Sequence, residues 1–284
     1  MRGFLISSNL WVGLAVGLLS LMSFPAPWSM EAYLYALFLL LATSSAYSYM
    51  RWVKIAQQNT GGQPSKVAGF KQPLAALIYS LFMGLASLYV LRWFYSWDLL
   101  IALAPAVLVA VLYPLAFPHP NRYFTSLRTI PMLKLLLISG IWAWLSFALP
   151  MLHMDQIWTF HFYLELLFRT FLVAGLTIPF DIRDMDYDLS QMKTIPQLMG
   201  VDASLQLANF FLLLYQLWTI AAYFIWDLSL AQAVAWLVGL EVGAYLIRKV
   251  RRNRSEIYIG FWVEAIPIIV FILLLLAQWA WGIY

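Results

Sequence analysis

The chain has 284 residues, of which 63% are hydrophobic and only 11% are charged. Its mean hydropathy of +0.80 and its 14 tryptophans exclude a soluble globular domain, in which apolar residues make up about one half of the chain. The composition is that of a polytopic membrane protein. The absence of cysteine excludes disulfides, thiol catalysis and cysteine-based metal sites.

Apolar runs long enough to cross about 30 Å of hydrocarbon as helices of roughly 20 residues recur along the chain. Because strand edges exposed to lipid cannot satisfy their hydrogen bonds, the runs predict an all-α membrane bundle. We expect nine transmembrane helices, at 4–23, 31–51, 73–93, 98–117, 132–151, 158–180, 205–225, 229–248 and 260–282. No small-residue cleavage site ends the first apolar run, so it is interpreted as a retained anchor. The whole chain, 1–284, is predicted to form one integral-membrane domain.

The distribution of basic residues predicts the orientation, since cytoplasmic loops are enriched in lysine and arginine. With the N-terminus inside, all of the 17 basic residues except Arg92 and Arg169 fall at the cytoplasmic side or its membrane interface. The N-terminus is therefore predicted to be cytoplasmic and the C-terminus outside. The net charge of +4 follows from this topology and requires no nucleic-acid partner. The long connections, at 52–72, 118–131 and 181–204, are all predicted to be cytoplasmic.

Four carboxylates follow the sixth apolar run within eight residues: Asp181, Asp184, Asp186 and Asp188. If the sixth helix continues by two turns, Asp181, Asp184 and Asp188 share one helical face. Three carboxylates on one face repel one another unless a cation neutralises them, and hard oxygen ligands favour Mg²⁺ or Ca²⁺ over zinc. Because Mg²⁺ completes its shell with water and phosphate oxygens, the matching substrate is a phosphorylated or diphosphorylated lipid. The alternative is a solvated helix end that contacts headgroups or nearby basic side chains.

The stretch from Pro179 to Gly200 resembles the second aspartate-rich motif of the UbiA superfamily of intramembrane prenyltransferases. The similarity includes the trailing Lys193-Thr-Ile-Pro and Leu198-Met-Gly200. A weaker match precedes the fifth span, where the family has a basic segment: Tyr123, Arg128, Ile130-Pro131 and Lys134. Nine helices with the acidic motif at the end of the sixth are also similar to the architecture of that family.

The resemblance implies a UbiA prenyltransferase-like bundle that binds a polyprenyl diphosphate in the bilayer and transfers the prenyl group to an acceptor. It implies Mg²⁺ as cofactor, held by three catalytic carboxylates: Asp181, Asp184 and Asp188. It implies that three basic side chains bind the diphosphate: Arg128, Lys134 and Lys193. Ionising an allylic diphosphate requires stabilisation of charge on the leaving oxygens, which metal and cations supply. The identity of the acceptor is not encoded in these motifs.

The chain departs from the family at the first acidic motif, which is expected within 46–59. This segment reads Ala46-Tyr-Ser-Tyr-Met-Arg51-Trp-Val-Lys54-Ile-Ala-Gln-Gln-Asn59 and contains no acid. Two interpretations are open. Either Arg51 and Lys54 replace one metal in holding the diphosphate, or the chain is a catalytically silent homologue that binds an isoprenoid lipid or a partner protein. Arg51 is equally well placed to be an interfacial anchor.

Ionisable residues inside the apolar runs indicate function by default. Glu165 and Arg169 are four residues apart and are expected to pair on one helix face. Self-pairing weakens the functional interpretation, because a neutralised pair that faces the bundle interior can be purely structural. A transporter is a third class of function, and this pair is the only feature that hints at it. Glu264 lies in the last span, where we expect it to reach Arg251 or Arg252.

Overall fold

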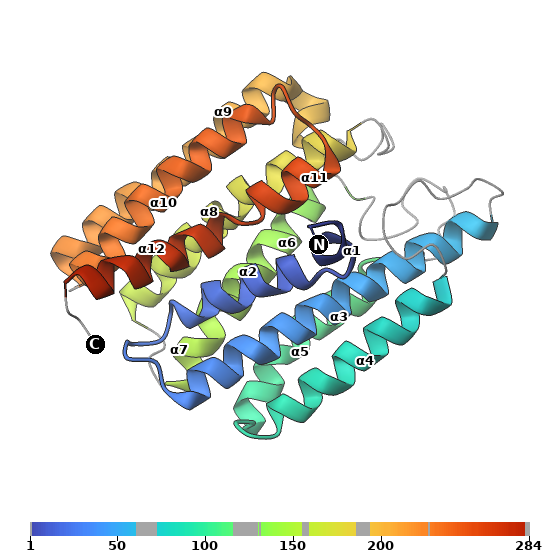
Figure 1. The fold of residues 1–284 in the computed structure, drawn as a ribbon, viewed down its shortest axis with the longest axis horizontal. Coiled ribbons are helices and arrows are strands. Elements are labelled where there is room, and N and C mark those ends of the chain that lie inside the picture. Colours follow the sequence, from blue (N-terminus) through green and yellow to red (C-terminus); the bar gives the residue numbers. More distant parts are fainter. Residues whose placement is uncertain are drawn as a thin grey trace.

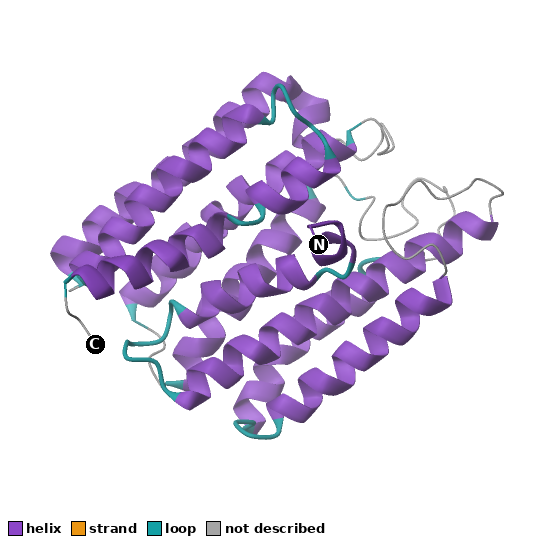
Figure 2. Ribbon diagram, viewed as in Figure 1, coloured by secondary structure: helices purple, strands orange, loops and turns teal. Residues whose placement is uncertain are grey.

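The computed structural model describes residues 2–60, 73–115, 130, 132–154, 159–185, 194–226 and 228–281. Within these ranges the chain forms helices and connecting turns and contains no strand (Figures 1 and 2). The prediction of an all-α bundle is confirmed. The bundle consists of long helices that run roughly along one direction (Figure 1).

The first half of the chain forms α1 (Arg2–Ser7), α2 (Leu10–Leu21), α3 (Met30–Thr60), α4 (Pro73–Leu91) and α5 (Trp97–Leu112). A continuous helical stretch follows in three pieces: α6 (Leu133–Ala143), the π-helical turn η2 (Trp144–Ala148) and α7 (Leu149–His153). The second half contains α8 (Phe160–Asp184), α9 (Ile195–Ile225) and α10 (Leu230–Lys249). The last stretch is formed by α11 (Glu256–Tyr258), the π-helical turn η4 (Ile259–Val263) and α12 (Ile266–Ala280).

Six of these stretches are long and apolar enough to cross a membrane: Pro73–Leu91, Leu133–His153, Phe160–Asp184, Ile195–Ile225, Leu230–Lys249 and Glu256–Ala280. Leu10–Leu21 and Trp97–Leu112 are shorter apolar helices. The chain is therefore an integral membrane protein. Every predicted span overlaps a helix, but the number of nine membrane crossings stays a prediction.

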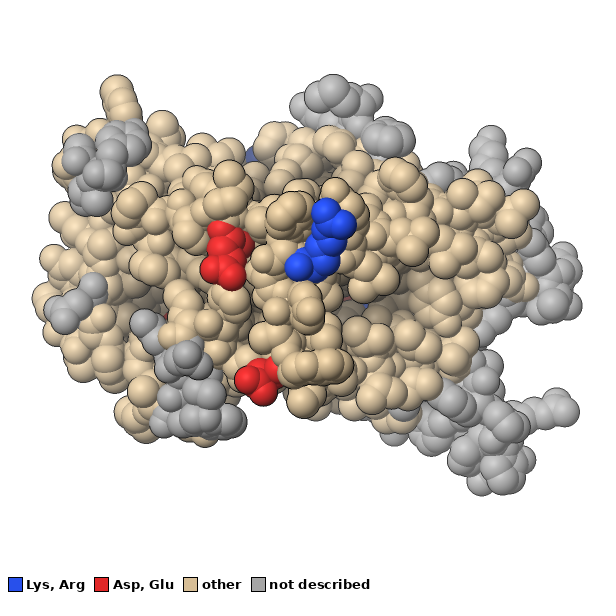
Figure 3. Space-filling model, turned by 90° about the horizontal axis from the view of Figure 1, so that it is seen from below, with Lys and Arg blue, Asp and Glu red and all other residues tan. Residues whose placement is uncertain are grey.

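The lower face of the bundle in Figure 1 is drawn directly in Figure 3, and few charged side chains are visible on it among the described residues. The outward side of α4 carries large apolar side chains that are more than half exposed: Leu74, Ile78, Leu81, Phe82, Leu85 and Leu88. Apolar surface of this extent is unusual for a soluble monomer. Lipid tails cover such a surface without cost, in agreement with the membrane assignment.

The helix that contains the seventh predicted span, 205–225, begins ten residues before the span. Helical structure starts at Ile195. The preceding residue, Thr194, caps the helix: its backbone N–H donates to the Gln197 side-chain oxygen at 3.0 Å. The backbone then bends at Gly200, whose φ of 79° lies in the left-handed region that glycine adopts without steric cost. A short entry helix therefore precedes the long part of α9, and hydropathy alone does not detect it because it lies outside the continuous apolar run.

Buried apolar side chains form two main clusters. The larger joins α8, α9, α10 and α12 through residues such as Leu172, Ile178, Leu212, Leu240 and Val270. The second joins α2, α3, α5 and α7 through residues such as Val16, Tyr35, Leu39, Leu99 and Leu149. In Figure 1 the helices α9, α10 and α12 lie on one side of the bundle and α3, α4 and α5 on the other, with α2 and α6 between them.

Two glycines allow α2 to approach α3 closely. A Cβ atom at Gly13 would lie 2.4 Å from the carbonyl oxygen of Leu40, and one at Gly17 would lie 2.6 Å from the carbonyl oxygen of Ala36. Spaced four residues apart, the two glycines form the small-residue stripe that permits tight packing of membrane helices.

Gly13→Ala is expected to lower the free energy of unfolding by about 1–3 kcal/mol, because its methyl group must displace the backbone of α3. Thermal unfolding in detergent measures the change. Gly140→Ala is the matched control, since a Cβ at Gly140 meets nothing within 4 Å. Alanine in a helix should leave the stability equal or raise it by up to about 1 kcal/mol. Equal losses in both variants would contradict the close contact.

Candidate functional site

A cavity of about 870 Å³ lies inside the bundle, with walls contributed by α3, α4, α5, α6, α8 and the last helical stretch. Its lining on α3 extends from Phe38 to Lys54, which is about 24 Å at a rise of 1.5 Å per residue. Most of the lining is apolar. Ligand pockets typically measure roughly 300–1,000 Å³, so this cavity has the size and character expected for an elongated apolar ligand.

The charged lining residues gather at one end of the cavity. They are Arg51 and Lys54 on α3, Lys134 on α6, Arg183 and Asp184 on α8, and Glu264 after η4. These residues come from the end of α8, the beginning of α6 and the second half of α3. Among the described lining residues, four cations therefore face two carboxylates. Among the described residues that line this end of the cavity, cations outnumber carboxylates.

Asp184 is paired with its neighbour in the chain. Arg183 donates to both carboxylate oxygens of Asp184, from Nε to Oδ1 at 2.7 Å and from Nη2 to Oδ2 at 3.1 Å. The charges of Lys134 and Lys54 also act on Asp184. The carboxylate of Asp184 therefore interacts with three cations, Arg183, Lys134 and Lys54.

Asp181 lies on the other side of Lys134. Its side chain is 2% exposed, and Lys134 Nζ lies 2.5 Å from Asp181 Oδ1. Asp181 faces a small pocket with Met132 and Ile195 and does not line the large cavity. Sequence spacing placed Asp181 and Asp184 on one face, but residues three apart are offset around a 3.6-residue turn. Lys134 separates the two carboxylates.

The shared helical face of the three aspartates required two further turns after residue 180, and α8 ends at Asp184. Carboxylates are unfavourable near the negative C-terminal end of a helix, which explains the earlier end of this acid-rich run. Asp188, Arg128 and Lys193 lie outside the described residues. Within the described part of the chain, no group of three or more His, Cys, Asp or Glu residues is arranged to hold a metal ion.

Arg51 lines the cavity and is held in place by the N-terminal segment. Its guanidinium donates to the carbonyl oxygen of Ser7 at 2.5 Å and to Oδ1 of Asn9 at 3.1 Å. Asn9 has a φ of 57° and donates from Nδ2 to the hydroxyl of Ser48 at 2.9 Å. The break between α1 and α2 is therefore what fixes the position of Arg51. The arginine reaches the cavity wall instead of serving only as an interfacial anchor.

Two charged lining residues, Arg183 and Glu264, were not among the predicted site residues. Glu264 was expected to reach Arg251 or Arg252, but Arg251 pairs with Asp202 at 3.0 Å, and Glu264 interacts electrostatically with Arg183 and Arg51. The signal for Glu264 was available, because a carboxylate in an apolar span marks a functional position by default.

The apolar walls of the cavity include side chains with a large accessible surface. Leu88 on α4 and Val107 and Leu108 on α5 line it and are 60%, 58% and 56% exposed.

No protein-family model and no curated protein sequence matches this chain, but solved structures do. The apo structure of a UbiA homolog from Aeropyrum pernix K1 has a TM-score of 0.63 at 17% identity, over 95% of this chain and 98% of the other. A UbiA homolog from Archaeoglobus fulgidus bound to GPP and Mg²⁺ has a TM-score of 0.62 at 14% identity, over 98% and 99%. A digeranylgeranylglyceryl phosphate synthase structure has a TM-score of 0.52 at 13% identity, over 97% of each chain.

The chain has the UbiA fold. The resemblance inferred from the motif at 179–200 is confirmed at the level of the fold, and it extends over nearly the whole chain. Within this UbiA fold, the segment 46–59 that lacks acids contributes Arg51 and Lys54 to the charged end of the cavity. Cations therefore stand on α3 where the family resemblance led us to expect carboxylates.

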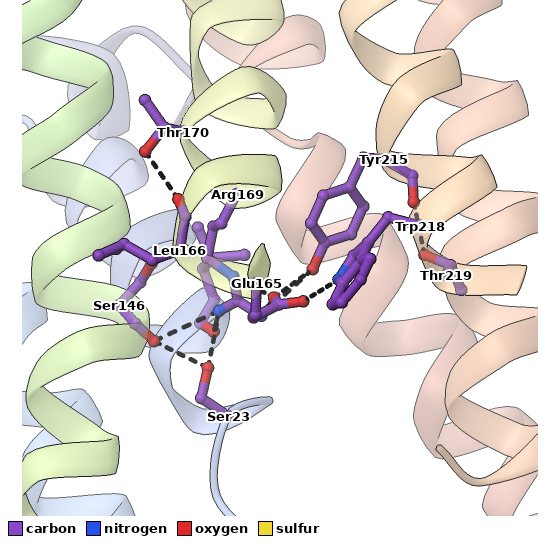
Figure 4. A network of polar contacts seen from close by, with 10 residues as sticks. Ser23, Ser146, Glu165, Leu166, Arg169, Thr170, Tyr215, Trp218 and Thr219 are labelled. Carbon is purple, nitrogen blue, oxygen red and sulfur yellow. Dashed lines mark hydrogen bonds and ion pairs between the residues drawn. The ribbon is translucent and has the colours of Figure 1, made fainter. Parts of the chain in front are cut away.

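A second buried polar cluster of this chain lies outside the cavity lining (Figure 4). Arg169 donates from Nε to Glu165 Oε1 at 2.9 Å and from Nη1 to the Ser23 hydroxyl at 2.7 Å. The Tyr215 hydroxyl donates to Glu165 Oε1 at 2.8 Å, and Trp218 Nε1 donates to Glu165 Oε2. The expected Glu165–Arg169 pair is confirmed. Its partners come from α8, α9 and the end of α2, so the cluster is a structural connection between helices.

Arg169→Met is expected to lower the free energy of unfolding by about 3–5 kcal/mol, because it leaves the buried Glu165 carboxylate without its counter-charge. Detergent-solubilised protein is unfolded thermally to measure this. Arg92→Met is the matched control: Arg92 is exposed and stacks on the rings of Tyr89 and Trp93. Its loss should cost about 1 kcal/mol or less. A loss for Arg169→Met no greater than that of the control would refute the structural role.

Proposed function

We propose that this chain binds a polyprenyl diphosphate in the large cavity and transfers its prenyl group to an acceptor. The diphosphate lies at the charged end, and the prenyl chain follows the apolar walls. One observation carries the proposal, namely the convergence of Arg51, Lys54, Lys134 and Arg183 at one end of an otherwise apolar cavity. In support, UbiA homologues of the same fold are bound to GPP or DMAPP with Mg²⁺.

The charged end provides what heterolysis of the carbon–oxygen bond requires. The bonding electron pair leaves with the diphosphate, so negative charge grows on oxygens that face preorganised cations. The allylic cation that remains is stabilised by aromatic faces in the lining, such as those of Tyr47 and Trp142. The acceptor then forms a bond to the prenyl carbon and loses a proton. Trp142 Nε1 donates to the Tyr47 hydroxyl at 3.3 Å, which orients both rings.

We include Mg²⁺ in the proposal, with Asp184 as the carboxylate that lines the cavity. Since Mg²⁺ takes only one or two carboxylates and completes its shell with water and phosphate oxygens, one aspartate at this position fits the ion. Asp181 would join the ligand set by exchanging Lys134 for the metal, and Asp188 stays a proposed ligand outside the described residues. Bound there, the ion would supply Lewis-acid stabilisation of the diphosphate. Arg128 and Lys193 stay proposed diphosphate partners.

A catalytically silent homologue that binds an isoprenoid lipid is the second candidate. The absence of acids in 46–59 favours it, because that segment supplies no metal ligand. Both candidates share the binding step and differ only in the transfer step. Binding is therefore measured first.

Geranyl diphosphate with Mg²⁺ is expected to bind the purified wild-type protein in a calorimetric titration. Ala42→Trp should weaken this binding about tenfold or more, because the indole fills part of the apolar lining that Ala42 contributes. Leu85→Trp is the control, since Leu85 is 68% exposed and does not line the cavity. Failure of the wild type to bind geranyl diphosphate would exclude the proposed function, and equal effects of the two tryptophans would exclude this cavity as the site.

We also propose that the charged end faces the cytoplasm, with the N-terminus inside and the C-terminus outside. Because the chain has no cysteine, single cysteines are introduced at two exposed positions near opposite ends of the bundle. In intact cells a membrane-impermeant thiol reagent should label Tyr95→Cys, whereas Arg252→Cys should react only after permeabilisation. The reverse pattern would invert the topology.

A further inference from the structure

We infer that the side-chain cations hold the diphosphate directly, so that a prenyl diphosphate binds this chain even when no divalent metal is present. This inference rests on the proposed function and concerns how the same site recognises its ligand. Arg51 and Arg183 are the two residues on which it depends most.

The charge balance of the cavity is the first support. Among the described residues, four cations and two carboxylates line its charged end. Asp181, which lies 2.5 Å from Lys134 Nζ, brings the balance to four cations and three carboxylates. Positive charge enclosed by a membrane bundle is costly unless an anion or hydrogen-bond acceptors compensate it. A ligand with a strongly negative headgroup neutralises this excess. A divalent cation that arrives alone increases it.

The positions of the carboxylates are the second support. Both oxygens of Asp184 accept hydrogen bonds from Arg183, and Asp181 lies 2.5 Å from Lys134 Nζ. A metal that used either aspartate would have to separate it from a cation. A phosphate group carries the same sign of charge as a carboxylate, so it can bind Arg183 with the same two parallel hydrogen bonds that Asp184 now accepts.

The preorganisation of Arg51 is the third support. Its two described hydrogen bonds, to Ser7 and Asn9, occupy two of the five N–H groups of a guanidinium. The same bonds hold the group at the cavity wall before any ligand arrives, which reduces the entropy lost on binding. Arg51 therefore presents a fixed positive charge at the place where a headgroup would lie.

The test is a pair of calorimetric titrations of the full-length protein with geranyl diphosphate, one with Mg²⁺ and one with EDTA. We expect the dissociation constant in EDTA to be within about tenfold of that in Mg²⁺. In EDTA, Arg51→Gln and Arg183→Gln should each weaken binding about tenfold or more, as is typical when a charged hydrogen-bonding partner is lost. Geraniol, which lacks the diphosphate, should bind at least tenfold more weakly than geranyl diphosphate.

Arg251→Gln is the matched control, because Arg251 is an exposed arginine that pairs with Asp202. Its binding in EDTA should equal that of the wild type. Since Arg51 also holds the junction between α1 and α2, each variant is checked by thermal unfolding. Lys54→Met is the second variant, because Lys54 is another cation of the cavity lining. It should weaken binding in EDTA while Arg51 keeps its hydrogen bonds to Ser7 and Asn9.

The outcomes separate the inference from the function on which it rests. Binding that requires Mg²⁺ would overturn the inference and leave the proposed function intact. Geraniol binding as tight as geranyl diphosphate in EDTA, or folded Arg183→Gln and Lys54→Met variants that bind like Arg251→Gln, would also overturn it. Absence of binding in both conditions would overturn the proposed function itself.

Discussion

A charge between membrane helices is stable only where opposite charge or hydrogen bonds neutralise it. This constraint accounts for both polar regions inside the bundle. Around Arg169, the compensation is complete, because Glu165, Ser23 and Tyr215 all contact the guanidinium. At the charged end of the cavity, cations outnumber carboxylates among the described lining residues. The first region connects helices, and the second is open to a ligand.

The two regions differ in solvation as well as in charge balance. Glu165 and Arg169 are 8% and 4% exposed and lie within packed helices. Arg183 and Asp184 are partly exposed and border a cavity of about 870 Å³. Charge that borders a cavity remains able to exchange partners, whereas charge enclosed by packed side chains does not. This difference separates a structural ion pair from a binding site in the same helix, α8.

Several polar contacts between helices involve backbone groups at interruptions of regular α-helix. In the π-helical turn η2, the carbonyl oxygen of Ser146 accepts from the Ser23 hydroxyl at 2.8 Å, and the preceding carbonyl, of Leu145, accepts from the Tyr35 hydroxyl at 3.1 Å. A π-helical turn leaves carbonyl groups available to such partners, which is why these turns recur near functional regions. The break at Asn9 similarly brings backbone and side-chain acceptors to Arg51. Regular helices supply the walls, and their interruptions orient the polar groups.

Hydropathy predicted the helices well because lipid permits few alternatives to a helix for an apolar run. The exceptions have local causes. The entry helix before Gly200 lies outside the apolar run, and the end of α8 at Asp184 follows from the carboxylates beside a helix C-terminus. The motif at 179–200 also indicated the correct fold. The solved UbiA structures compared above share at most 17% sequence identity with this chain.

Composition, hydropathy and one acidic motif by themselves determined that the chain is an all-α membrane bundle with the UbiA fold. They also identified Asp184, Lys134 and Arg51 as candidate site residues. Only the tertiary structure decided that these three side chains meet at one cavity, that Asp181 faces away from it, and that Glu264 joins it. The physical reason is that helical periodicity specifies a face of one helix, whereas the neighbour of that face depends on how separate helices pack. The net charge at a site is the sum of the side-chain charges that several helices contribute, so one helix alone does not determine it.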